Sequence, residues 1–443
     1  MSPLVNELPA ELLELIIDQI PLSSPQGRKT LCTCLLVSKI FFLRSRSRLF
    51  YHVDLYPDDD RTSRTTALRI LLESEVDENN GYPSLGRCIK SLEVIWPPSA
   101  FHSTSVDISH EEFRKHLSFD IDDVAAILSV LARTRLVQTF SLYFADTTGF
   151  SNFQSITPIW NAVDGICHSP TLESLNLEHL WGVPHDVFDI RTIKNLSLSN
   201  VTSSDELDFV RNAENDGGTL PPSQLRCFTY TFRCPFSSRW LQTLSPFSYL
   251  HTLVVKFDSV LPDNPNSQFD TLLMLCSGTL ESLSISLDSA TPVFKLYPHL
   301  LQRLTVLRAL KFTVHSNSPP VFGAQHDYEP STSFTRTHDV VESLETLQSV
   351  PNSLQSIGVD FRARLEVEYG AGFRSDHDWQ KLGDKLIESR YSLVQKITVA
   401  LLVNASMSGE KPYSQAPLFN IFSKRWEARY PTIPIKVVEI AAN

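Results

Sequence analysis

Cysteine and histidine pairs are the residues of this chain whose spacing could support metal chemistry. The close cysteine pairs are Cys32 with Cys34 and Cys227 with Cys234. Neither is accompanied by a second Cys or His pair at the sequence spacing of a zinc site. The histidines at positions 110 and 116, and at 326 and 338, lack the spacing of ligands on one helix face. We therefore expect no metal site and no cofactor.

Catalytic motifs are also missing from the sequence. It contains no G-x-S-x-G, no P-loop, no G-x-G-x-x-G after an expected strand and no H-E-x-x-H. The His-Asp dipeptides, at positions 185, 326, 338 and 377, fall near expected turns, where these residues serve as caps. We expect a binding protein and not an enzyme.

The elements that present the remaining side chains begin with an apolar stretch from Leu8 to Phe50, which we call the N-terminal helical segment. Pro9 suits the start of a helix, and the spacing of the apolar residues after it predicts one stripe. That stripe contains Leu12, Leu13, Ile16, Ile17 and Ile20. After a break at Pro21–Gly27 we expect a second helix from about Lys29 to Leu43, apolar on more than one side. A chain this short cannot bury all of these residues against itself, so the rest of the chain or a partner must cover them.

The order of these residues resembles the F-box motif, in the form common among fungal F-box proteins. The first part is LPAELLELIIDQI, matched at Leu8, Pro9, Glu11, Leu12, Ile16 and Ile17. The second part is matched at Cys34, Leu36, Val37, Ser38, Lys39, Ser45, Arg46, Leu49 and Phe50. The resemblance covers about a tenth of the chain, and it departs at Phe41, where many members carry Trp.

The resemblance implies that the segment binds the Skp-type adaptor of an SCF (cullin–RING) ubiquitin ligase. Docking of a helix in a groove needs apolar anchors at this spacing. The implied adaptor-binding residues are Leu8, Pro9, Leu12, Ile16, Ile17, Leu36, Val37, Ser38 and Phe41. The alternative is that these residues only form the N-terminal cap of the core of the following domain.

Composition restricts the class of partner and the compartment. Residues 1–56 hold six Lys/Arg and five Asp/Glu, a net charge of +1, whereas the whole chain carries −11. The remaining residues therefore carry about −12, an acidity that disfavours binding to nucleic acid and to anionic membranes. The run Arg44, Arg46 and Arg48 is expected to be a solvated helix end. No apolar run reaches about 18 residues, and the N-terminus does not read as a secretory signal. The odd number of cysteines, seven, favours reduced thiols in the cytoplasm or nucleus.

A repeated apolar pattern predicts the fold of the rest of the chain. Ten triplets share the order apolar, two residues, apolar, one residue, apolar: Ile89-Leu92-Val94, Val137-Phe140-Leu142, Leu172-Leu175-Leu177, Ile193-Leu196-Leu198, Leu225-Phe228-Tyr230, Leu250-Leu253-Val255, Leu280-Leu283-Ile285, Leu307-Leu310-Phe312, Leu354-Ile357-Val359 and Val394-Ile397-Val399. Helical stretches are expected between them, at 121–133, 156–168, 205–215, 269–277, 340–350 and 379–390. The pattern resembles a degenerate leucine-rich repeat, in which each unit supplies a short parallel strand and a helical return.

We therefore expect an α/β chain with an F-box-like helical domain at 1–56 and a linking helix and loop at 57–84. An irregular leucine-rich-repeat horseshoe follows at 85–443, capped by a helix at 418–430 and the residues at 433–440. A doubly wound α/β domain is the competing fold, disfavoured because the strands are short and no Gly-rich phosphate turn follows them.

The residues between the buried positions of each triplet are expected to share one exposed face. Those assigned to binding a target protein are Tyr143, Asn176, Glu178, Ser199, Thr231, Lys256, Ser286, Lys311 and Asp360. The face could equally be a solvated side of the sheet, and it does not identify a substrate.

Three function classes therefore stay open. The first is the substrate-recognition subunit of an SCF ligase, which holds an unknown protein target close to the ligase. The second is an adaptor-independent leucine-rich-repeat scaffold, in which the N-terminal helical segment is structural. A hydrolase with scattered catalytic residues is a third possibility. The first two differ in whether Leu8, Pro9, Ile17, Val37 and Phe41 are free to bind.

Overall fold

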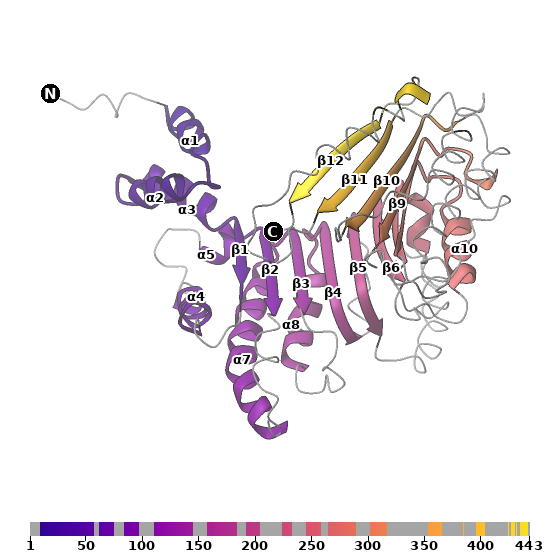
Figure 1. Cartoon of the computed structure of the whole chain (residues 1–443). Helices are drawn as coiled ribbons and strands as arrows, with labels where there is room; N and C mark the ends of the chain where they lie inside the picture. Colours follow the sequence, from indigo (N-terminus) through magenta and orange to yellow (C-terminus); the bar gives the residue numbers. More distant parts are fainter. Residues whose placement is uncertain are drawn as a thin grey trace. The chain divides into compact units, whose positions relative to one another are not determined.

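The structure is a computed structural model in which two compact units are distinguished. They comprise Met1–Ser197 with Val201–Thr219, and Leu198–Asn200 with Leu220–Asn443. Figure 1 labels the helices and strands along the chain. The described residues are 9–56, 62–74, 84–96, 110–144, 157–183, 192–203, 224–232, 245–257, 265–288, 302–316, 353–365, 384, 396–403, 424, 427–429, 431 and 435–441. Among them, no helix combines the length and apolarity needed to cross a membrane. The predicted domain boundaries at 56 and 84 stay a prediction.

The N-terminal helical segment contains three helices: α1 (Ala10–Asp18), α2 (Pro25–Cys34) and α3 (Lys39–Leu49). The predicted single helix from Lys29 to Leu43 is wrong, because the chain turns after Cys34 and starts a new helix at Lys39. Ser38 is the N-cap of α3, and its hydroxyl accepts a hydrogen bond from the Phe41 N–H at 3.5 Å.

Gly27 is required by the way α2 begins. The hydroxyl of the N-cap residue, Ser24, accepts a hydrogen bond from the Gly27 N–H at 2.9 Å. A Cβ added at Gly27 would overlap the carbonyl oxygen of Pro21. The break between the first two helices therefore depends on a residue without a side chain.

The first unit builds a parallel sheet behind this segment. Its strands β1 (His52–Leu55), β2 (Ser91–Trp96), β3 (Thr139–Phe144) and β4 (Ser174–Val183) pair in chain order. The helices between them are α4 (Thr62–Ser74), α5 (Leu85–Cys88), α7 (His110–Thr134) and α8 (Thr157–Cys167), and α7 packs against both α4 and α8. Asp123 of α7 holds α4 through Arg69, whose Nη1 lies 2.6 Å from Oδ1 of the carboxylate. The strand β5 (Asn195–Ser203) lies where the two units divide.

The second unit repeats this arrangement. Its strands are β6 (Cys227–Phe232), β7 (Thr252–Phe257), β8 (Ser282–Asp288), β9 (Ala309–Ser316), β10 (Ser356–Leu365), β11 (Lys396–Val403) and β12 (Ile435–Ala441). They pair in parallel and in chain order. The 3-10 helix η5 (Ser245–Tyr249) and the helix α10 (Pro265–Leu275) come before β7 and β8 respectively. An α/β architecture with parallel strands is thereby confirmed.

The apolar triplets form the core. In the second unit Leu253, Leu283 and Leu310 lie opposite one another on neighbouring strands, and each is at most 1% exposed. The members of the first nine triplets whose side chains are described are all buried, and Leu354 is the most exposed at 8%. Val394 lies outside the described residues. Period-two burial on a strand explains why the last two residues of each triplet point into the same layer.

Three of the predicted helices correspond to α7, α8 and α10, of which α7 is longer than expected. The predicted helices at 205–215 and 340–350 lie outside the described residues, and those at 379–390 and 418–430 lie mostly outside them. Their described residues, 384, 424 and 427–429, are helical.

A repeated backbone contact sets the register of the strands. The carbonyl oxygen of Tyr51 accepts hydrogen bonds from the N–H groups of Lys90 and Ser91, both at 2.9 Å. The same two-donor contact recurs at later strands. Its acceptors are the carbonyl oxygens of Lys90, Gln138, Glu173, Arg226, His251, Glu281 and Arg308. Because a carbonyl oxygen has two lone pairs, each contact satisfies both and fixes the next strand against the preceding one.

Candidate functional site

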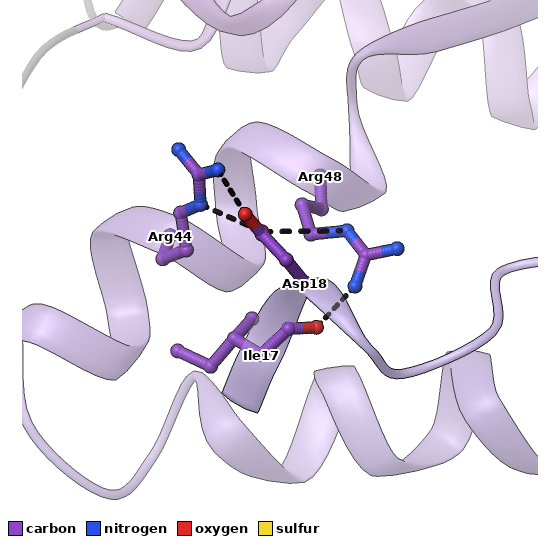
Figure 2. A network of polar contacts seen from close by, with 4 residues as sticks. All are labelled: Ile17, Asp18, Arg44 and Arg48. Carbon is purple, nitrogen blue, oxygen red and sulfur yellow. Dashed lines mark hydrogen bonds and ion pairs between the residues drawn. The ribbon is translucent and has the colours of Figure 1, made fainter. Parts of the chain in front are cut away.

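The N-terminal helical segment is held together by an ion-pair network at its base (Figure 2). Arg44 donates from Nε to Asp18 Oδ1 at 2.8 Å and from Nη2 to Oδ2 of the same carboxylate. Arg48 places Nε 3.9 Å from Asp18 Oδ1, and its Nη1 donates to the carbonyl oxygen of Ile17. The hydrogen bonds from Arg44 lower the pKa of the Asp18 carboxyl, and the same contact raises the pKa of Arg44. The network therefore ties the end of α1 to α3.

The predicted role of the basic run as a solvated helix end is wrong. Arg44 and Arg48 hold Asp18, and Arg46 is 8% exposed. The Arg46 guanidinium carbon lies 5.6 Å from the centroid of the Phe42 ring, within the range of a cation–π contact. All three arginines thus contact other parts of the segment.

The segment has a small apolar core of its own. Leu13, Ile17 and Leu31 are buried, and Ile17 and Leu31 are 0% exposed. The expectation that Ile17 contacts an adaptor directly is therefore corrected. Its side chain faces the other helices of the segment, because the two residues of α1 that point inward, Leu13 and Ile17, are one helical turn apart.

A second set of apolar residues is left in water. Leu12 is 45% exposed and Ile16 is 53% exposed on α1, while Leu36 (88%) and Val37 (59%) lie in the turn before α3. Burying one such side chain fully is worth about 1.5–3 kcal/mol, so this surface gains free energy when a partner covers it. Leu15 of α1 and Ile40 of α3 are also exposed.

The other predicted adaptor-binding residues differ in their exposure. Pro9 is exposed at the start of α1, and Ser38 is exposed although its hydroxyl caps α3. Phe41 is partly buried, and Leu8 lies outside the described residues. Four apolar residues in the two parts of the motif, Leu12, Ile16, Leu36 and Val37, are therefore open to a partner.

No protein-family model matches the chain, and no curated protein sequence is significantly similar to it.

The predicted target-binding residues fall into a row in the second unit. Parallel register aligns Thr231 with Lys256, Lys256 with Ser286, Ser286 with Thr313, and Thr313 with Asp360. Lys311 lies one strand from Asp360, and its Nζ is 2.5 Å from Asp360 Oδ2. Thr231 is 7% exposed, so its assignment to direct target contact is corrected: the side chain is covered within the sheet. Ser199, which lies on β5, is partly buried.

In the first unit the predicted residues gather on β3 and β4. Tyr143 lies opposite Glu178, and Asn176 lies opposite Ser141. The Tyr143 ring meets the His179 ring edge-on at a centroid distance of 5.5 Å. All three predicted residues are partly buried, so their outer atoms are accessible on one face.

Sequence reasoning missed a polar group at the first two strands. His52 and Asp54 lie on β1, and Glu93 lies opposite Asp54 on β2. One ligand atom from each of the three lies within 4.8 Å of the others. The sequence indicates that His52 and Asp54, two residues apart on a strand, lie on one face of the sheet. It does not predict the register that brings Glu93 beside them.

A cleft of about 540 Å³ lies beside this polar group, where the N-terminal helical segment meets β1. His52 and Asp54 line it, together with Asp18, Arg28, Arg44 and Arg48. The Nε of Arg28 donates to the carbonyl oxygen of Leu22 at 2.9 Å, which fixes one wall.

Proposed function

We propose that the chain is the substrate-recognition subunit of an SCF-type cullin–RING ubiquitin ligase, in which the N-terminal helical segment binds the Skp-type adaptor. The observation that carries the proposal is the exposure of Leu12, Ile16, Leu36 and Val37 at motif positions of an F-box. Apolar side chains left in water on a helix and in the turn before another helix are typical of a surface that a protein partner covers.

The packing of the segment supports this proposal over the alternative of an N-terminal cap. Its helices are joined by their own contacts: the buried Leu13, Ile17 and Leu31, and the ion pair between Asp18 and Arg44. The exposed residues contribute to neither contact. A segment that served only to cover the core of the following domain would turn its largest apolar side chains inward.

We further propose that each of the two units is built of degenerate leucine-rich repeats and that these repeats bind the target protein. Support comes from the strand spacing, the burial of the triplets and the two-donor carbonyl contact at the start of successive strands. In the second unit the proposed target-binding residues are Lys256, Ser286, Lys311 and Asp360, and in the first unit they are Tyr143, Asn176 and Glu178. In this proposal the chain itself is not catalytic, and ubiquitin transfer belongs to the partner subunits.

The test is co-expression of the full chain with a Skp-type adaptor, followed by size-exclusion chromatography. We expect a one-to-one complex that is lost with Leu36→Ser plus Val37→Ser. Both residues are exposed, so this double change leaves the melting temperature of the chain within about 2 °C.

The matched control is Ile70→Ser plus Leu71→Ser on α4. These residues are 54% and 47% exposed, so the control removes two exposed apolar side chains outside the F-box-like segment. We expect it to keep the adaptor bound. If both double variants retain the adaptor equally, or if the wild-type chain elutes alone, the ligase role is refuted and the adaptor-independent scaffold becomes the better account.

A further inference from the structure

The group formed by His52, Asp54 and Glu93 has the composition and spacing of a metal site. His52 Nε2 lies 2.5 Å from Asp54 Oδ1, and the ligand atoms of all three residues lie within 4.8 Å of one another. Each residue sits on β1 or β2, so paired strands fix their backbones. Among the residues that the structure describes, this is the only such group of His, Cys, Asp and Glu.

Charge favours a cation at this point. Asp54 and Glu93 are directly opposite each other in the register of β1 and β2. Two carboxylates facing each other across neighbouring strands repel, which costs stability unless a positive charge lies between them. A protonated imidazole supplies one such charge, whereas a divalent cation supplies two and contacts all three side chains.

The orientation of His52 suits a metal ligand. Its Nδ1 lies 2.8 Å from the hydroxyl oxygen of Ser91, which is its partner in the strand register. Without a cation, the 2.5 Å contact between Nε2 and Asp54 Oδ1 is a hydrogen bond that Nε2–H donates. When a cation replaces that proton, Nδ1–H donates to the Ser91 hydroxyl and Nε2 offers its lone pair as a ligand. Histidines that bind metals are commonly oriented by a hydrogen bond from the second ring nitrogen in this way.

We propose that His52, Asp54 and Glu93 bind a Zn²⁺ ion, with the remaining coordination position open to the adjoining cleft. Tetrahedral ligands at Zn²⁺ distances stand about 3.3 Å apart, so Nε2 and the Asp54 oxygen must separate by less than 1 Å. The two side chains are 50% and 37% exposed, which leaves room for that movement. Water or a carboxylate of a bound protein completes the coordination. This proposal does not depend on the adaptor-binding role.

The test is a Zn²⁺ titration of the full-length, tag-free chain after chelator treatment, followed by isothermal calorimetry. The chain holds 13 His and seven Cys, so matched variants are needed to assign the site. His52→Ala removes the nitrogen ligand, and Glu93→Gln removes one charge at constant size. The control is His168→Ala. His168 follows the last residue of α8 and pairs with Asp164 of that helix at 3.2 Å, and in the described structure no third ligand completes a group with them.

We expect the wild-type chain and His168→Ala to bind one Zn²⁺ with the same affinity, and both site variants to bind it at least about tenfold more weakly. Zn²⁺ should also raise the melting temperature of the wild-type chain but not that of Glu93→Gln. If His52→Ala fails to fold, the isosteric Glu93→Gln variant decides the question. Equal titrations for all variants, or Mg²⁺ binding as tight as Zn²⁺ binding, would overturn the proposal and leave an ion pair.

Discussion

Ile16 and Ile17 are neighbours in α1, one exposed and one buried. Their replacement by Ala should therefore change the stability of the N-terminal helical segment to very different extents. Ile17 is 0% exposed and Ile16 is 53% exposed. Truncating a buried Ile to Ala costs about 2–5 kcal/mol, because the removed atoms leave a cavity. Ala has the higher helix propensity by about 0.4 kcal/mol, which offsets a small part. We therefore expect Ile17→Ala to destabilise the N-terminal helical segment by about 2–4 kcal/mol and Ile16→Ala to change it by less than about 0.5 kcal/mol.

Hydrogen exchange followed by mass spectrometry is the suitable assay, because it reports on the segment separately from the rest of a 443-residue chain. A loss of about 3 kcal/mol raises the open fraction of the segment about 100-fold, and amides of α1 and α3 exchange faster by that factor. Peptides from α7 and α8 should be unchanged. Equal protection in the two variants would refute the assignment of Ile17 to the core of the segment.

Adaptor binding should show the reverse order in the proposed complex. Ile16→Ala removes an exposed contact, so it should weaken the complex while protection of α1 stays as in the wild type. Ile17→Ala should weaken binding only in proportion to the unfolding of the segment. If Ile17→Ala abolished binding with full protection retained, the buried placement of its side chain would be wrong.

Three further results are expected. Gly27→Ala should unfold the start of α2, since a Cβ there overlaps a carbonyl oxygen, and exchange of α2 amides would reveal it. Arg44 lowers the pKa of the Asp18 carboxyl from its usual value of 3.8. The ion pair therefore stabilises the segment above pH 3.8, and this stabilisation is lost as the pH falls through the lowered pKa. Circular dichroism should show this acid transition in the wild type but not in Asp18→Asn. Iodoacetamide should label the exposed Cys32 and spare Cys276, whose burial raises the pKa of its thiol to about 12, as peptide mass spectrometry of the native chain would show.

The strands were predictable from sequence because the last two residues of a triplet, such as Leu283 and Ile285, are apolar and alternate with polar residues at period two. Burial then followed from the pattern alone. The break between α2 and α3 was not predicted, since Leu35, Leu36 and Val37 continue an apolar run that fits a helix. The signal against it was Ser38, a good N-cap residue placed just before the first residue of α3.

The candidate site, too, was predictable from the sequence only in part. The motif order indicated Leu36 and Val37 correctly as exposed, but could not separate Ile16 from Ile17, because a stripe pattern does not say which edge of the stripe is covered. The roles of Arg44 and Arg48 depend on where α1 ends relative to α3, a tertiary contact over 26 and 30 positions of sequence. Glu93 was missed for a similar reason, since its register partner Asp54 lies on another strand.

The two-donor carbonyl contact has a consequence for how the protein is made. Within each unit a strand bonds to the strand synthesised just before it, and the triplets begin 21 to 48 positions apart. At ordinary translation rates a ribosome delivers the next strand about every 1–10 s. Each emerging strand finds a formed edge with a carbonyl oxygen already in place. The sheet of a unit can therefore grow in the direction of synthesis, and its newest edge stays open to pairing until the next strand emerges.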